Sequence, residues 1–139
     1  MNNPIIYADF NGILPSSQNE NRSAIPLDTY GSLKDLTNRQ IRLKIGMPLT
    51  IYMDSAPGED LEVESTVYYD LEHKQWLAEF DYEKIRYVQS HADLWTRKDF
   101  LCFHCRQDLE PFFREHPRNF ETTCTHCGLS ILHVLSAPE

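Results

Sequence analysis

The chain has 139 residues, 41% of them hydrophobic and 12% aromatic, and a formal net charge of −8 at pH 7. This length suits one ordinary domain or two small ones, and the apolar content is sufficient for a packed core. The acidic balance argues against a protein that coats nucleic acid, since phosphate binding normally needs clustered lysine and arginine. The sequence begins without a basic segment and has no run of about 18 apolar residues, so we expect a cytoplasmic protein without a membrane span.

The first part of the chain predicts short β-strands separated by polar turns. Apolar and polar residues alternate in several segments, as in strands with one buried face. The expected strands are residues 5–10, 41–45, 49–53, 61–69, 76–82 and 85–88. The polar stretch 15–23 predicts a loop. Five or six short strands with hairpin connections predict a mainly β fold, arranged as a small antiparallel β-barrel or sandwich.

Residues 25–82 contain three segments that match a known barrel pattern. They are Leu-Asp-Thr-Tyr-Gly at 27–31, Gly-Met-Pro-Leu-Thr-Ile at 46–51 and Leu-Glu-Val-Glu-Ser-Thr-Val at 61–67. The order resembles PilZ-type domains and implies a small barrel-like shape. The paired arginines with which that family grips a cyclic dinucleotide are absent, because only Arg22 lies in the corresponding stretch. The resemblance therefore extends to shape alone.

Charge is distributed unevenly along this part of the chain. Between residues 31 and 53 the basic side chains outnumber the single acid, and between residues 54 and 83 acids predominate. The basic residues are Lys34, Arg39, Arg42 and Lys44. Two solvated faces of a small sheet explain this pattern; the alternative is a basic edge for an acidic ligand.

All four cysteines of the chain fall in two Cys-x-x-Cys pairs, Cys102 with Cys105 and Cys124 with Cys127. This spacing is typical of a tetrahedral Zn²⁺ site. No export signal is visible and no cysteine is left over, so disulfides are the poorer interpretation. Four thiolates leave no coordination position for water or substrate, and we therefore expect one structural Zn²⁺. Rubredoxin-type iron and a metal-free redox dithiol are the alternatives.

The two cysteine pairs, over residues 97–135, resemble the zinc-ribbon superfamily. The second pair is followed by Gly128, which suits a tight turn after the last ligand, whereas the first is followed by Arg106. We also expect a short helix at 110–115 and a strand at 129–134. The resemblance implies a binding platform, since such modules are common in proteins that attach to transcription or translation machinery. We expect two parts: a β-barrel or sandwich domain over residues 1–90 and a zinc-ribbon module over 91–139.

Catalytic signatures are not evident in the sequence, because the histidines lack a partner carboxylate at a readable spacing and no phosphate-binding glycine loop occurs. We expect a non-enzymatic zinc-binding adaptor or regulatory protein that contacts a protein partner. Its candidate surface combines basic and aromatic side chains: Lys34, Arg39, Arg42, Lys44, Trp95, Phe112 and Phe113. One alternative is a nucleic-acid-associated transcription or translation factor that uses the basic strand and the ribbon aromatics. The other is an enzyme or redox dithiol protein.

Overall fold

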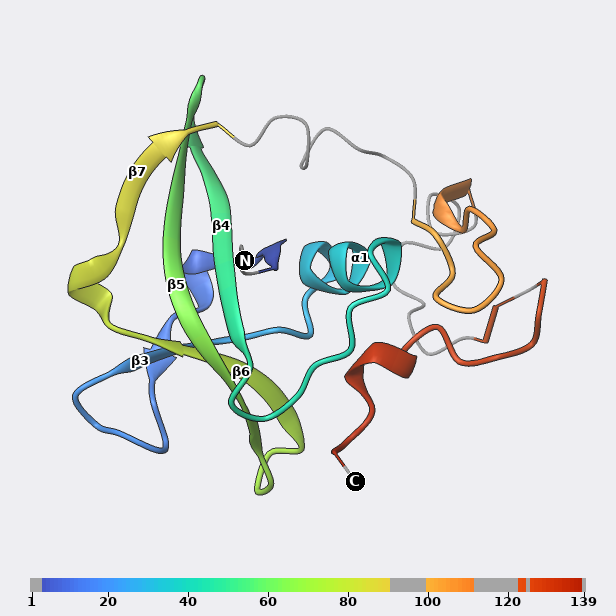
Figure 1. The fold of residues 1–139 in the computed structure, drawn as a ribbon, viewed down its shortest axis with the longest axis horizontal. Coiled ribbons are helices and arrows are strands. Elements are labelled where there is room, and N and C mark those ends of the chain that lie inside the picture. Colours follow the sequence, from blue (N-terminus) through green and yellow to red (C-terminus); the bar gives the residue numbers. More distant parts are fainter. Residues whose placement is uncertain (1–3, 91–99, 112–122, 125, 139) are drawn as a thin grey trace.

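The computed structural model describes residues 4–90, 100–111, 123–124 and 126–138. Within these residues the fold is mainly β, as predicted, with a seven-stranded sheet and one α-helix (Figure 1). The strands are β1 (Ile5–Tyr7), β2 (Leu14–Pro15), β3 (Ser23–Pro26), β4 (Pro48–Ala56), β5 (Glu59–Asp70), β6 (Gln75–Phe80) and β7 (Arg86–Gln89). The α-helix is α1 (Tyr30–Asn38), and the 3-10 helices are η1 (Phe10–Gly12), η2 (Tyr82–Lys84) and η3 (His133–Leu135). In this part of the chain no helix has the length and apolar character needed to cross a membrane.

Strands β4, β5 and β6 form an antiparallel meander at the centre of the sheet. Ile51 lies opposite Val63 and Val67 lies opposite Ala78, and all four side chains are fully buried. Beyond the meander the strand order runs β1-β4-β5-β6-β3-β2, with β7 paired to the first half of β5. β1 joins β4 in parallel, so the sheet is mixed. The order ends at β1 and β2 without closure, and the predicted barrel is therefore wrong.

Helix α1 explains why the sheet stops at β1. In a parallel pair, alternate residues of β1 direct their backbone groups away from β4, and these groups need other partners. The N–H of Tyr7 donates to the Asp35 carboxylate at 2.8 Å, and the Ser32 hydroxyl donates to the Tyr7 carbonyl at 2.7 Å. The Arg39 guanidinium donates to the carbonyl of Ile5. Side chains of α1 thus occupy the edge where another strand would pair.

The sequence analysis did not predict α1. Thr29 precedes the helix with an extended backbone and serves as its N-cap residue, and Leu33 and Leu36 are buried on its inner face. The apolar periodicity is short and interrupted because Asp35 and Asn38 are buried as well. These polar residues bond to β1 and to the C-terminal part of the chain. Tertiary contacts therefore stabilise a helix that the apolar periodicity of the sequence does not predict.

The strand predicted at residues 41–45 is wrong, because this segment is an irregular connection between α1 and β4. The alternation of side chains nevertheless has a physical counterpart. Leu43 is buried, whereas Arg42 and Lys44 on either side of it are exposed. Ile45 departs from the pattern, with 62% of its surface exposed. The segment therefore anchors on one leucine and presents two cations to solvent.

Other boundaries also differ from the predictions. The first strand ends at Tyr7 rather than at residue 10, because the Asp9 side chain accepts the N–H of Asn11 and starts η1. The predicted loop at 15–23 is shorter, since β2 ends at Pro15 and β3 begins at Ser23. β3 was not predicted at all; it is only four residues long and gains its partners from β6 and β2.

The C-terminal part of the chain packs against α1, and its first cysteine-containing segment, residues 100–111, lies on the side of α1 away from the sheet (Figure 1). Phe100, Leu109 and Ile131 are buried in the same hydrophobic cluster as Leu33 and Leu36. A strand at 129–134 is not formed, since one isolated bridge at Ser130 is followed by a turn and η3. Most of the helix predicted at 110–115 lies outside the described residues. The division into residues 1–90 and 91–139 stays a prediction, although the described residues of both parts share one core.

Candidate metal centre

Each cysteine pair lies on the same kind of tight loop. In the first loop the Cys102 N–H donates to the Gln107 carbonyl at 2.9 Å, and the Arg106 N–H donates to the Cys102 carbonyl at 3.1 Å. The second loop repeats both bonds, from Cys124 N–H to the Leu129 carbonyl at 2.8 Å and from Gly128 N–H to the Cys124 carbonyl at 2.9 Å. Isolated bridges close the loops, Leu101 with Asp108 and Thr123 with Ser130. Two equivalent knuckles therefore face each other.

Both knuckles require a left-handed residue directly after the second cysteine. Gly128 adopts a φ of 75°, which glycine accepts without strain, and Arg106 adopts a φ of 65° at the equivalent position. For a residue with a side chain this conformation costs on the order of 1 kcal/mol. The Arg106 guanidinium offsets the cost through two hydrogen bonds, to the carbonyls of Thr37 at 2.9 Å and Asn38 at 2.6 Å. It thereby satisfies carbonyls in the last turn of α1, where a cation is favourable.

The four sulfur atoms form a compact cluster, in which all four Sγ atoms lie within 4.8 Å of one another. Cys102 Sγ lies 3.8 Å from Cys127 Sγ, and Cys105 Sγ lies 3.6 Å from Cys124 Sγ. A regular tetrahedron with Zn–S bonds of about 2.3 Å has S–S edges of about 3.8 Å. None of the four cysteines forms a disulfide. The donor set and its spacing therefore fit a tetrahedral metal ion, as the sequence predicts.

Backbone N–H groups surround the sulfurs. The N–H of His104 donates to Cys102 Sγ at 3.4 Å, and the N–H of His126 donates to Cys124 Sγ at 3.3 Å. Such bonds stabilise thiolate charge around a metal. The imidazole rings of these two histidines do not belong to the ligand cluster. His104 instead packs on Phe103, with ring centroids 5.3 Å apart.

The four thiols influence one another's ionisation. Burial opposes ionisation of Cys124, but the N–H groups of Cys127 and His126 outweigh it and lower the pKa of this thiol to about 7. For Cys105 the N–H of Gln107 favours the thiolate, yet burial and the neighbouring sulfurs raise its pKa to about 12. Adjacent thiolates repel each other, so all four ionise together only when a cation compensates their charge. A divalent metal supplies that charge.

The C-terminal end of α1 holds the first knuckle in place. The Asn38 side-chain carbonyl accepts the N–H of Leu101 at 2.6 Å, and the Gln40 amide donates to the Phe103 carbonyl at 2.9 Å. Together with Arg106, these bonds fix the knuckle to one helix end. The chain after the second knuckle is tied to the sheet, because the Trp76 indole N–H donates to the Ser136 carbonyl at 3.0 Å.

The predicted basic surface is not one surface. Lys34 lines a cavity of about 230 Å³ beside β1 and β4, and Arg39 is engaged with the Ile5 carbonyl. Arg42 and Lys44 line a separate groove next to the C-terminal segment. Trp95, Phe112 and Phe113 lie outside the described residues.

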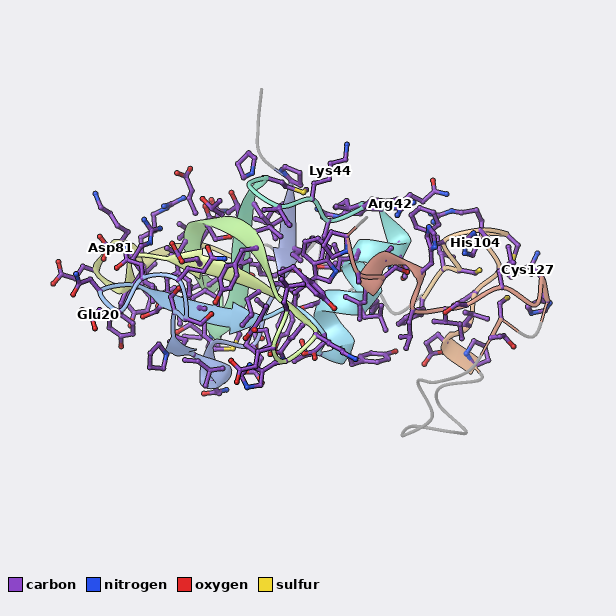
Figure 2. All side chains as sticks on the ribbon, turned by 90° about the horizontal axis from the view of Figure 1, so that it is seen from below. Glu20, Arg42, Lys44, Asp81, His104 and Cys127 are labelled. Carbon is purple, nitrogen blue, oxygen red and sulfur yellow. The ribbon has the colours of Figure 1, made fainter. Side chains whose placement is uncertain are left out.

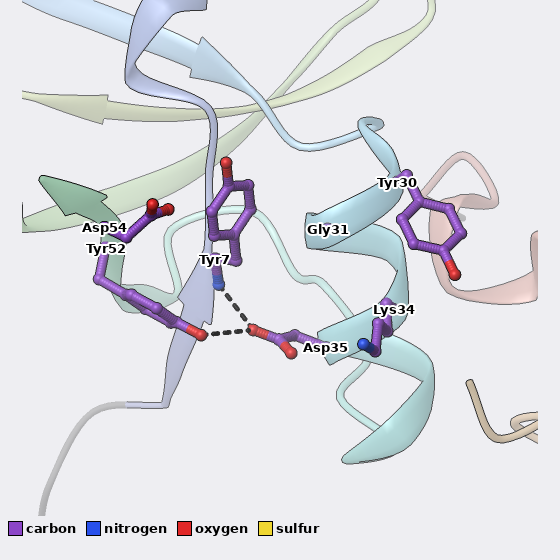
Figure 3. Close-up of a pocket in the computed structure, with 7 residues that line it drawn as sticks. All are labelled: Tyr7, Tyr30, Gly31, Lys34, Asp35, Tyr52 and Asp54. Atoms are coloured by element: carbon purple, nitrogen blue, oxygen red, sulfur yellow. Dashed lines mark hydrogen bonds between the residues drawn. The ribbon is translucent and has the colours of Figure 1, made fainter. Parts of the chain in front are cut away.

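The cavity at Lys34 contains a buried carboxylate (Figure 3). Asp35 accepts the N–H of Tyr7 at 2.8 Å and faces the Tyr52 hydroxyl at 3.5 Å. Burial raises the pKa of Asp35, and burial together with the Asp35 charge raises the pKa of Tyr52. Gly31 is required here, since a Cβ atom at this position would lie 2.4 Å from the Tyr7 ring. These contacts join β1, β4 and α1, so we assign the cluster a structural role.

Sequence reasoning identified all four cysteines and missed the residues that attach them to the fold. Asn38, Gln40 and Trp76 carry no motif, and their partners are 60 or more residues away in sequence. The sequence marks Arg106 as the residue in place of a glycine after Cys105 and as a cation near the thiolates, but not as a link to α1. Comparison with models of protein families, with curated protein sequences and with solved structures finds no match to this chain.

Proposed function

We propose that the four cysteines bind one Zn²⁺ in a structural centre of the zinc-ribbon kind, and that the protein is a non-enzymatic adaptor that contacts a protein partner. The observation that carries this proposal is the sulfur cluster, whose 3.6 and 3.8 Å separations fit a tetrahedral ion. Four sulfur ligands leave no position for a substrate or a reactive water. Such a centre supports structure rather than catalysis.

The local structure indicates what the metal stabilises. Among their described residues the two knuckles carry one isolated bridge each, so this strand-like pairing contributes little to their stability. In modules of this size the free energy of metal binding is largely the free energy of folding. Bound Zn²⁺ would hold the two knuckles together and, through Asn38 and Arg106, against the end of α1. A zinc thiolate site of this kind is suited to the reducing cytoplasm.

A protein partner agrees better with the charge distribution than nucleic acid does. The four basic residues of the predicted surface do not lie together, because Arg42 and Lys44 share one groove, Lys34 lines a separate cavity and Arg39 is engaged within the fold. A net charge of −8 also opposes association with a polyphosphate, which is bound through many Lys and Arg contacts. The nucleic-acid alternative therefore has less support.

Metal analysis of protein purified without a metal-binding tag tests the zinc centre. We expect one zinc per chain, and we expect Co²⁺ substituted for it to show the absorption of a tetrahedral thiolate site. Cys105→Ser should abolish binding of either ion. His73→Ala is the control, because it alters the Asp70-Glu72-His73 group, which could also hold a metal ion, and it should leave the zinc content unchanged. Iron as the resident metal, or metal-free protein with a Cys–Cys disulfide, would contradict the proposal.

A further inference from the structure

A groove of about 700 Å³ runs between the connection after α1 and the C-terminal segment. This volume is within the range of pockets that bind ligands. Its lining combines cations, apolar side chains and a buried indole: Arg42, Leu43, Lys44, Ile45, Trp76, His133, Ser136, Ala137 and Pro138. Among these described residues there is no aspartate or glutamate. In a chain with 21 acids against 13 basic residues, such a groove is unusual.

Arg42 and Lys44 have no ion-pair partner among the described residues. Other cations of the fold are engaged, Arg22 with Glu79 at 3.2 Å and Arg86 with Glu62 at 2.6 Å. Figure 2 shows Arg42 and Lys44 away from the end of the molecule that carries Glu20 and Asp81. Within the described residues, the groove therefore has a local positive charge that no carboxylate pairs with.

The wall that carries these cations is held in place by the fold. The Ile41 N–H donates to the Leu36 carbonyl at 2.9 Å, and the Gly46 N–H donates to the Val67 carbonyl at 2.8 Å. Between these two bonds, Leu43 is buried in the core. A short segment fixed at both ends loses little conformational entropy when a ligand binds, which favours affinity.

The opposite wall adjoins the metal centre. The His133 ring lies 4.7 Å from that of His104 and 4.9 Å from that of Phe103, which are both part of the first knuckle. Burial, Arg42 and His104 lower the pKa of His133, whose ring lines the groove. The Trp76 indole bonds to the Ser136 carbonyl and fixes the segment that completes this wall. The shape of the groove thus depends on the knuckle.

We propose that this groove binds an acidic segment of a protein partner in which carboxylates alternate with apolar side chains. Arg42 and Lys44 would pair with the carboxylates, and the exposed Ile45 would contact an apolar side chain. A nucleic acid is a poorer fit, because two free cations offer few phosphate contacts. This inference rests on the proposed adaptor function and names its contact surface.

Fluorescence anisotropy with a defined peptide tests the inference. The probe is a fluorescein-labelled octapeptide of alternating glutamate and leucine, and its counterpart carries glutamine in place of glutamate. The protein is the full chain with zinc bound, and the zinc content and circular dichroism spectrum of every variant are measured first. A variant with altered zinc content or an altered spectrum reports on the zinc centre. A variant with normal zinc content, a normal spectrum and altered peptide affinity reports on the groove alone.

We expect the glutamate peptide to bind and the glutamine peptide to bind at least about tenfold more weakly, since each lost charge pair removes a fraction of the binding free energy. The double variant Arg42→Glu with Lys44→Glu should lower the affinity for the glutamate peptide by a similar factor. The charge-matched control is Lys74→Glu with Lys84→Glu, because both lysines lie outside this groove and the control should bind normally.

Ile45→Ser separates the apolar contribution from the charge contribution. It should lower the affinity for the glutamate-leucine peptide by about threefold and leave the affinity for a glutamate-serine peptide unchanged, because only the former peptide loses an apolar contact. Equal binding of the glutamate and glutamine peptides, or equal losses in the groove and control variants, would overturn the proposal. So would an oligothymidine of eight nucleotides that binds more tightly than the peptide.

Discussion

The sheet and the cysteine knuckles are stabilised in different ways. In the sheet, seven strands share backbone hydrogen bonds, and the side chains of β4, β5 and β6 form a buried core. In the part of the chain that the structure describes, the knuckles have one bridge each, a few bonds to the end of α1 and a sulfur cluster suited to a metal. We therefore expect the sheet to persist by its own packing and the knuckles to depend on a bound ion. Helix α1 serves both regions, since it covers the β1 edge and receives the first knuckle.

Loss of a metal ligand should produce the largest difference in stability between the sheet and the knuckles. Cys102→Ser or Cys127→Ser is expected to abolish zinc binding and unfold the C-terminal third while the sheet stays largely folded, because structural zinc contributes about 10 kcal/mol or more to such modules. Limited proteolysis with mass spectrometry reports which segments are cleaved. His126→Ala, within the second knuckle but outside the ligand cluster, is the control. Protease resistance of residues 100–111 in the cysteine variants would contradict the prediction.

A cavity under α1 should affect both regions. Leu36 is fully buried in the cluster that joins the sheet to Phe100 and Ile131. Leu36→Ala should lower the free energy of unfolding by about 3 kcal/mol, and it should also weaken zinc binding because the helix end supports the first knuckle. Urea denaturation and competition with a zinc chelator measure the two effects.

Leu77→Ala is the matched control for this cavity, since Leu77 is buried in a separate cluster with Ala24 and Tyr68. It should reduce the free energy of unfolding by a comparable amount and leave zinc affinity unchanged. Equal zinc affinities in the Leu36 and Leu77 variants would show that α1 does not support the knuckle.

The left-handed position after each cysteine pair allows a finer comparison of the knuckles. Arg106→Ala loses the bonds to α1 and keeps the backbone strain, whereas Arg106→Gly loses the bonds and relieves the strain. The glycine variant should therefore be more stable than the alanine variant by about 1 kcal/mol. Gly128→Ala should be destabilising by a similar amount. Thermal denaturation of the zinc-bound proteins measures these differences, and equal stability of the two Arg106 variants would exclude strain at this position.

The smallest expected effect concerns Asp35 at the contact between α1 and β1. Burial raises the pKa of this carboxyl, even though the Tyr7 N–H and Arg39 favour the charged form. A carboxyl with a raised pKa holds its proton more tightly in the folded protein, so its contribution to stability increases as the pH falls toward the ordinary value of 3.8. Asp35→Asn removes this contribution. The wild type should therefore gain stability relative to the variant as the pH is lowered, as measured by urea denaturation; a difference that is constant with pH would contradict the assignment.

The sequence was sufficient to predict the parts of the molecule that repeat a simple pattern. Strands β4, β5 and β6 follow from alternating residues such as Ile51, Val63 and Ala78, and the ligand cluster follows from cysteine spacing alone. Helix α1 escaped prediction because polar residues on its buried side, such as Asp35, interrupt the apolar pattern and bond to distant backbone.

The attachments of the metal centre could not be predicted for a related reason. Asn38 and Arg106 act through one and two side-chain hydrogen bonds, respectively, between segments more than 60 residues apart, and such bonds leave no local pattern. The basic segment 41–45 shows the opposite case, in which a strand-like alternation marks an irregular connection. In that segment Leu43 is buried and its neighbours Arg42 and Lys44 are exposed, although the segment does not pair with a strand.

Amide hydrogen exchange before and after removal of the metal tests the central claim most directly. We predict that a zinc chelator will remove protection from residues 100–111 and 126–138 and leave β4, β5 and β6 protected, because only the knuckles depend on the ion. Restoring zinc should restore protection. Unchanged protection of the knuckles after verified metal loss, or loss of protection across the whole sheet, would contradict the account.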